Sequence, residues 1–263
     1  MTICISVLCE DQEAAVVGAD RMVTDRTLPI EFESSDSKYQ PYRSENIRLV
    51  ISSAGPALAP ATINRAVEDS IDDIESVQQA VEIVKNVYIS MKQTKFEEEI
   101  LSQRGISFDE FYESGMYNSG RGEAWDKMYS EFELGLDVIV TGHDVNGSHT
   151  YRVSDKGGYN GLVESFANIG FDTVGTGSNL ARDTLTSRYS RDLTIEECLY
   201  VVYAALMNSA QAPGVGNKFD LTIVDGSGPR EVSEQTLTAI QKLFYDNEEA
   251  NRYPQEVNSS IEI

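Results

Sequence analysis

The spacing of apolar residues along the chain is the feature that most restricts its fold. Short apolar runs at 3–9 and 14–20, separated by a polar turn, predict a hairpin that begins with the first residues. Between residues 60 and 91 the apolar positions recur every three or four residues, which predicts either one long helix or two helices joined near 72–76. Strands and helices therefore come in blocks rather than in alternation.

The later elements follow the same arrangement. A capping box at 194–197 opens a helix with one apolar face, and another helix is predicted from Ser178 to Tyr189. Further strands are predicted at 47–53, 136–142, 150–154, 171–174 and 219–224, and a last helix at 234–244. This order lacks strict βαβ alternation and a glycine-rich phosphate loop. It favours an α+β fold of four layers, αββα, in which two antiparallel sheets lie between helical layers.

Length and composition favour one domain. A chain of 263 residues with 41% hydrophobic residues can bury one substantial core, so we expect a single domain over residues 2–245. Residues 93–134 are rich in charged and aromatic side chains and predict an inserted helical or loop element with a small core of its own. The polar residues 246–263 predict a tail that is disordered or contacts another subunit.

Charge and cysteine content exclude several classes of protein. The net charge is −22, from 43 acidic and 21 basic residues, so neither nucleic acid nor an anionic membrane is expected as a partner. Three cysteines without paired spacing, no secretory leader and no membrane-spanning run of apolar residues favour the cytoplasm. The chain has two histidines, too few for a histidine-rich metal site, and we expect no metal and no cofactor.

Five landmarks, in order, resemble the proteasome β family and its bacterial two-component relative. They are a threonine that opens the first strand, then G-A-D-R-M-V-T, S-A-G before a helix, V-G-T-G-S before another helix, and F-D-L-T-I-V-D. The corresponding positions are Thr2 and residues 18–24, 53–55, 174–178 and 219–225. Each motif is common by itself, and their joint order across residues 2–228 carries the resemblance. The segment 93–134 is unmatched. The resemblance implies an N-terminal-nucleophile (Ntn) hydrolase.

Thr2 is the nucleophile that the resemblance implies. A threonine hydroxyl is weakly nucleophilic at neutral pH, and one solution is its own α-amine, whose pKa of about 7.7–8.0 lets it accept the hydroxyl proton. This mechanism requires Thr2 to be the first residue of the mature chain. The small side chain at position 2 suits removal of Met1 by a methionine aminopeptidase. The alternative is that Thr2 is only a strand residue after a common initiator pair.

The resemblance implies roles for five other residues, namely Asp20, Lys38, Gly55, Thr176 and Thr24. Asp20 and Lys38 would orient Thr2 and activate it, with Arg43 as the fallback for the lysine. The backbone N–H of Gly55 would form the oxyanion hole. Thr176 would take the place of a family serine near the nucleophile, and the Thr24 backbone would pair with an extended substrate.

One departure from the family argues against ordinary peptidase activity. Before the last core strand the family has an aspartate followed by Ser-Gly-Gly, whereas residues 208–216 contain no aspartate. Asn208 and Ser209 are the candidates to replace it.

The implied function is a threonine-type endopeptidase that cleaves peptides or unfolded proteins through an acyl-enzyme at Thr2. The family implies a homo-oligomeric ring and leaves an ATPase partner open. Two alternatives stay open: a non-catalytic ring or scaffold subunit, and an Ntn transpeptidase or amidase.

Overall fold

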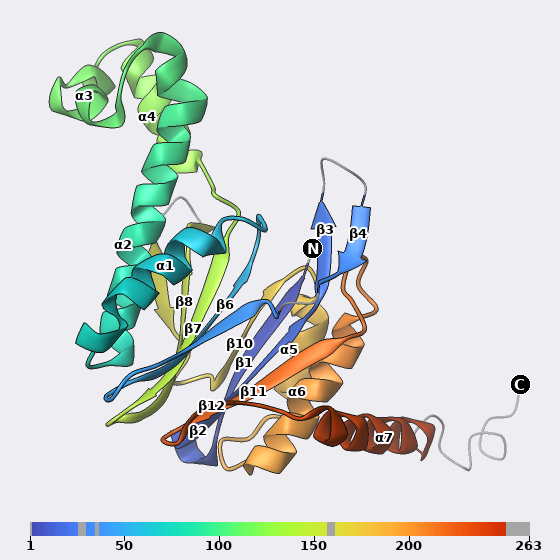
Figure 1. Cartoon of the computed structure of the whole chain (residues 1–263). Coiled ribbons are helices and arrows are strands. Elements are labelled where there is room, and N and C mark those ends of the chain that lie inside the picture. The colour runs from blue at the N-terminus through green and yellow to red at the C-terminus, as the bar shows by residue number, and fades with distance from the viewer. Residues whose placement is uncertain (1, 26–29, 35–36, 157–160, 251–263) are drawn as a thin grey trace, which may run out of the picture.

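Two antiparallel sheets and two helical pairs form the body of the protein, as Figure 1 shows. The structure is a computed structural model that describes residues 2–25, 30–34, 37–156 and 161–250. The α+β class predicted from the sequence is therefore confirmed.

The strands form two five-stranded sheets and one separate pair. The first sheet has the order β10 (Phe171–Gly175), β1 (Ile3–Cys9), β2 (Ala14–Asp20), β11 (Phe219–Asp225) and β12 (Gly228–Glu231). The second has the order β5 (Tyr39–Arg43), β6 (Arg48–Ala54), β7 (Asp137–Asp144), β8 (Gly147–Ser154) and β9 (Leu162–Ser165). β3 (Met22–Asp25) and β4 (Ile30–Glu33) pair only with each other among the described residues. The hairpin predicted at the start of the chain is β1 and β2.

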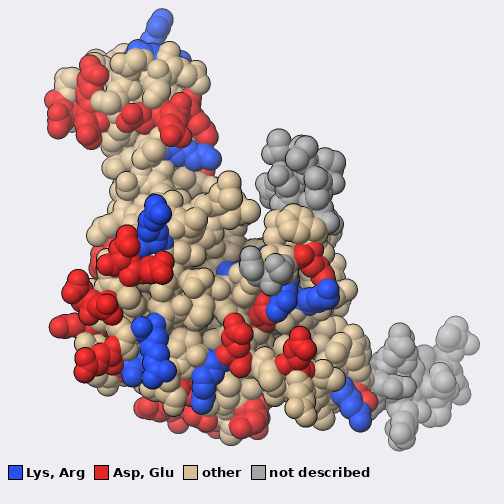
Figure 2. Space-filling view, viewed as in Figure 1, with Lys and Arg blue, Asp and Glu red and all other residues tan. Residues whose placement is uncertain are grey.

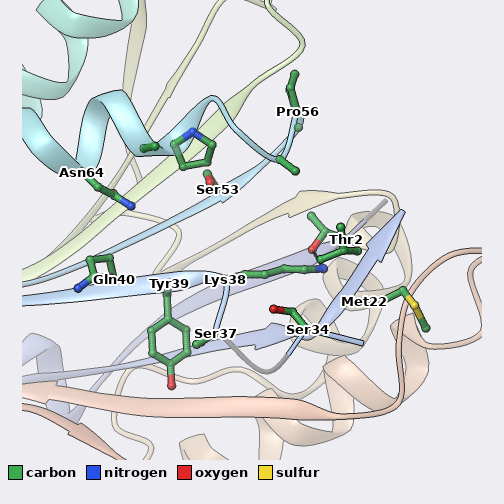
Figure 3. A pocket seen from close by; sticks show the side chains of 15 residues that line it. Thr2, Met22, Ser34, Ser37, Lys38, Tyr39, Gln40, Ser53, Pro56 and Asn64 are labelled. Atoms are coloured by element: carbon green, nitrogen blue, oxygen red, sulfur yellow. Dashed lines mark hydrogen bonds between the residues drawn. The ribbon is translucent and has the colours of Figure 1, made fainter. Parts of the chain in front are cut away.

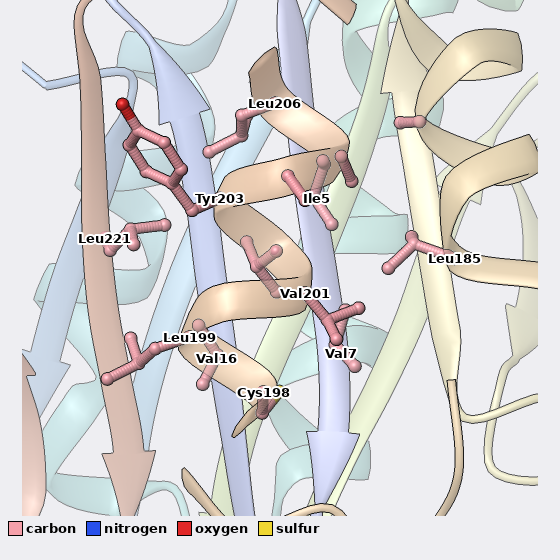
Figure 4. Packing of buried hydrophobic residues seen from close by; sticks show 14 of the residues in the cluster. Ile5, Val7, Val16, Leu185, Cys198, Leu199, Val201, Tyr203, Leu206 and Leu221 are labelled. Carbon is pink, nitrogen blue, oxygen red and sulfur yellow. The ribbon is translucent and has the colours of Figure 1, made fainter. Parts of the chain in front are cut away.

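The side chains of β1 alternate between two apolar environments. Ile3, Ile5 and Val7 pack against α5 (Ser178–Arg188) and α6 (Ile195–Ser209) on one face of the first sheet, in the cluster shown in Figure 4. Cys4 and Leu8 point the other way, into a cluster shared with the second sheet. Every residue of β1 is buried because both faces of its sheet are covered.

The second sheet packs against the other helical pair, α1 (Pro60–Ser70) and α2 (Val77–Phe96). Leu49 and Ile51 of β6 face these helices, while Val50 faces the first sheet. A short 3-10 turn separates α1 from α2, so the 60–91 segment is two helices. Ser76 caps the second helix by accepting a hydrogen bond from Gln79 N–H at 3.2 Å.

Most of residues 93–134 form a small helical head at the end of α2, away from the sheets (Figure 1), and Leu134 returns to the apolar cluster of the second sheet. The head contains α3 (Phe108–Glu113) and α4 (Arg121–Glu131). Phe96, Leu101 and Phe111 form its buried centre, surrounded by partly buried aromatic rings. The aromatic residues thus build a separate core, as their number predicted.

Some elements differ from the prediction. The 24–46 region contains β4, β5 and the end of β3, although its sequence lacks clear periodicity. β9 and β12 were also not predicted. The last helix, α7 (Glu234–Ala250), continues six residues beyond the predicted end at Phe244, so the first residues of the expected tail are helical. Residues 251–263, the rest of that tail, lie outside the described residues.

Candidate active site

Four strand ends bring the predicted site residues to one end of the two sheets. Thr2 immediately precedes β1, Asp20 ends β2, Lys38 immediately precedes β5, and Gly55 immediately follows β6. β5 and β6 are antiparallel neighbours with Tyr39 opposite Ser52. This register places the start of β5 beside the end of β6, so residues far apart in the sequence meet there.

Thr2, Asp20 and Lys38 form one hydrogen-bonded cluster. Thr2 Oγ1 donates to Asp20 Oδ1 at 2.7 Å. The Lys38 ammonium donates to the same Asp20 oxygen at 2.7 Å and also to Thr2 Oγ1. Figure 3 shows the Lys38 side chain extending along the pocket to the Thr2 hydroxyl. The hydroxyl is therefore held between a cation and a carboxylate.

Backbone amides fix the Asp20 carboxylate, which is fully buried. Its Oδ1 also accepts from Ile3 N–H at 3.0 Å, and its Oδ2 accepts from Met22 N–H at 3.2 Å and Gly216 N–H at 2.9 Å. A buried charge is tolerated when it is paired and hydrogen-bonded, and these contacts meet both conditions. Backbone amides thus fix both oxygens of the carboxylate independently of its contact with Thr2.

Gly55 lines the same pocket as Thr2 and Lys38. Its φ is +150°, and a Cβ at this position would lie 2.5 Å from the carbonyl oxygen of Gly135. Only glycine fits so close to a neighbouring backbone. Because it has no side chain, the part of Gly55 that faces the pocket is its backbone.

The other predicted residues take separate positions. The backbone of Thr24 lies in β3, opposite Glu31 of β4. Thr176 is exposed in the turn between β10 and α5 and does not line the pocket, whereas the preceding Gly175 contacts the Thr2 backbone. Arg43, the fallback for Lys38, lies at the far end of β5 beside Gly228.

In the segment without the family aspartate, Asn208 and Ser209 bond to groups other than Thr2. The Asn208 amide donates to Thr184 Oγ1 at 2.9 Å, and Ser209 Oγ donates to the carbonyl oxygens of Ala205 and Gly177. Gly216, near the end of this segment, reaches the site through its N–H. Sequence reasoning missed Gly216 because a backbone donor leaves no residue-type signal.

The Cys4 thiol is another potential nucleophile close to Lys38. Cys4 is fully buried near Lys38, and burial raises the pKa of its thiol to about 12, so it stays protonated. Nowhere in the described part of the chain do three or more His, Cys, Asp or Glu side chains gather as a metal site would require. No helix in that part has the length and apolarity to cross a membrane.

Comparison with known proteins gives partial sequence matches, and no family model matches the chain. "Proteasome subunit beta 2" of Pyrobaculum neutrophilum is 32% identical over 105 residues, 40% of this chain and 48% of that protein. "Proteasome subunit beta 2" of Nitrosopumilus maritimus is 31% identical over 111 residues, 41% and 48% of the two chains. "Proteasome subunit alpha" of Methanococcus maripaludis is 28% identical over 131 residues, 49% and 48%. The chain spans about half the length of the curated relatives that it matches.

Among solved structures, Anbu from Hyphomicrobium sp. strain MC1 superposes with a TM-score of 0.64. The superposition covers 100% of this chain and 99% of Anbu at 14% sequence identity, so the likeness concerns the fold. The partial matches to proteasome subunits confirm the resemblance that the sequence motifs indicated. The fold of this chain over its full length is similar to that of Anbu.

Proposed function

We propose that this chain is a threonine-type Ntn peptidase with Thr2 as its nucleophile. The observation that carries the proposal is the convergence of Thr2 Oγ1, Asp20 Oδ1 and Lys38 Nζ within hydrogen-bonding distance. A nucleophile, an anchored carboxylate and a cation beside an open pocket suit acyl transfer. The substrates are peptides or unfolded proteins.

The reaction begins when Met1 has been removed and Thr2 carries a free α-amine. The amine accepts the hydroxyl proton, directly or through water, while Oγ1 attacks the peptide carbonyl. Lys38 stabilises the negative charge that develops on Oγ1, and the Gly55 N–H stabilises the one on the carbonyl oxygen. The amine then protonates the leaving group, and water attack on the ester regenerates Thr2.

We also infer the four-layer αββα arrangement for this fold. Three apolar clusters support it, because one lies between the first sheet and α5–α6, one between the second sheet and α1–α2, and one between the sheets. A homo-oligomeric ring follows by analogy with the proteasome subunits, and an ATPase partner remains a proposal of the same origin.

The decisive experiment compares chains that differ only in their first residue. A form that begins at Thr2, released from a cleavable N-terminal fusion, is incubated with an unstructured protein beside a form that retains Met1. We expect peptide products only from the first form. Thr2→Ser should retain part of the activity and Thr2→Ala none. Equal cleavage by the Met1-retaining form would refute the mechanism.

A non-catalytic subunit is the second candidate function, and the segment 208–216 favours it. Asn208 and Ser209 donate hydrogen bonds to Thr184 and Ala205, and neither has the carboxylate that the family aspartate would supply. This candidate predicts an assembled protein without turnover even when the chain begins at Thr2. Product analysis in the presence of a competing amine would separate hydrolysis from the remaining alternative, a transpeptidase or amidase.

A further inference from the structure

A second buried polar cluster lies among the described residues, apart from the one around Thr2. Charged side chains gather on the surface of the head and of the lower body in Figure 2, whereas this cluster is interior. It consists of Tyr88 and Lys92, one turn apart on α2, and Asp155, which directly follows β8. At most 4% of each residue is exposed. The mechanism proposed above uses none of the three.

Two buried hydrogen bonds join this cluster to the backbone on either side of Gly135. The Tyr88 hydroxyl donates to the carbonyl oxygen of Leu136 at 2.8 Å, and Asp155 Oδ2 accepts from the N–H of Leu134 at 2.6 Å. Burial, with the Asp155 charge nearby, raises the pKa of Tyr88 well above its usual range, so the hydroxyl keeps the proton that it donates. The segment 134–136 is therefore held at both ends.

The segment 134–136 lies against Gly55, whose N–H would form the oxyanion hole. The pairing of β6 with β7 ends at Ala54, so Gly55 lies just beyond the strand ladder. There a Cβ on Gly55 would lie 2.5 Å from the Gly135 carbonyl oxygen and 2.9 Å from the Leu136 Cα. The position of the Gly55 backbone thus depends on its packing against this segment and no longer on the ladder.

From these contacts we infer that Tyr88 and Asp155 are positioning residues for the oxyanion hole. They hold the two ends of the 134–136 segment, and the Gly135 carbonyl oxygen between them keeps Gly55 at its φ of +150°. An N–H stabilises a developing oxyanion only when it is aimed at that oxygen, and a displacement of about 1 Å can cost about 100-fold in rate. The inference rests on the proposed function, because it assumes that Gly55 supplies this N–H.

The first test is Tyr88→Phe in the form that begins at Thr2, with a synthetic peptide that spans a cleavage site found in the unstructured protein. The variant keeps the ring and loses only the hydroxyl. We expect kcat to fall at least about 10-fold, part of the roughly 100-fold loss on removing an oxyanion-hole donor, with KM nearly unchanged. Tyr112→Phe loses a hydrogen bond of the same length, to Asp126 in the head, and should change neither constant. Equal effects of the two variants, or a loss confined to KM, would overturn the inference.

Gly135→Ala perturbs the segment directly and decides the question if Tyr88→Phe does not fold. Gly135 has a φ of +65° with open space around the added Cβ, so alanine strains the backbone without a clash. Gly105, in the head, has a φ of +70° and equally open surroundings, so Gly105→Ala is the matched control. Only the change at Gly135 should lower kcat, and equal kcat values in the two variants would overturn the inference.

Hydrogen exchange separates this inference from the proposed function, because it needs no turnover. In Thr2→Ala protein, adding Tyr88→Phe should accelerate amide exchange in residues 53–58 and leave residues 171–175 of β10 unchanged. This result, without cleavage by the form that begins at Thr2, supports the hold on Gly55 and overturns the peptidase. Cleavage that Tyr88→Phe slows no more than Tyr112→Phe does, with unchanged exchange in residues 53–58, supports the peptidase and overturns the positioning role.

Discussion

Replacing Lys38 by methionine tests the geometry of the site independently of activity. The substitution keeps most of the side-chain volume and removes the cation that contacts fully buried Asp20 at 2.7 Å. Breaking a buried ion pair by removing one partner typically costs about 3–5 kcal/mol, because the other charge is left unpaired. Asp20 keeps three backbone N–H donors, so we expect the lower end of this range, a loss of about 3 kcal/mol.

The assay is a double-mutant cycle in urea unfolding at pH 7. In an Asp20→Asn background, Lys38→Met should cost less than about 1 kcal/mol, because no buried charge is left behind. Lys85→Met is the matched control: its ion pair with Glu82 is 3.5 Å long and exposed, and its loss should cost at most about 0.5 kcal/mol. If Lys38→Met were no more costly than the Lys85 control, or equally costly in both backgrounds, Asp20 and Lys38 would not form the buried pair described above.

Three further predictions concern other parts of the molecule. In Gly175→Ala, the new Cβ would lie 2.2 Å from the Thr2 carbonyl oxygen, at a φ of +102°. The free energy of unfolding should therefore fall by about 1–3 kcal/mol. Gly105→Ala, at a φ of +70° with open space around it, controls for backbone strain alone, and an equal effect would exclude the clash. Burial raises the pKa of Asp172 to about 6. The folded state therefore binds more protons than the unfolded state between pH 4 and 6, and stability relative to Asp172→Asn should fall by about 3 kcal/mol over this range. Parallel pH profiles of the two proteins would contradict this. Phe111→Ala removes a fully buried ring and should destabilise the head by about 3–5 kcal/mol. Hydrogen exchange should then accelerate in α3 and α4 and not in β1, and uniform acceleration would show that the head and the body unfold together.

Burial explains which strands could be predicted from the sequence. β1 and β2 are buried along their whole length, so each leaves a continuous apolar run. In β5 only Tyr39 and Tyr42 are buried, and the residues between them are exposed. This spacing of three matches neither the alternation of a half-buried strand nor a continuous run. β5 is an edge strand joined to β6 by backbone hydrogen bonds, which carry no side-chain pattern.

The candidate site could be predicted from the sequence where it depends on residue type. Thr2, Asp20 and Lys38 have chemistry that a motif can retain, and the structure brings them together. Gly216 contributes through its backbone from 196 positions beyond Asp20, so only the folded chain reveals it.

The contacts around Thr2 also limit which group can take its proton. Lys38 donates to Thr2 Oγ1 through its ammonium, which has no lone pair to offer. Both Asp20 oxygens already accept hydrogen bonds from backbone N–H groups, and Oδ1 also accepts from Lys38 and from the Thr2 hydroxyl itself. The two histidines lie in β7 and β8 and do not line the pocket. The proposed mechanism gives this role to the nitrogen of Thr2, which is a base only as a free amine, because an amide nitrogen is not basic. The cluster can therefore orient Thr2 in any form of the chain, but the proposed chemistry requires the bond between Met1 and Thr2 to be cleaved first.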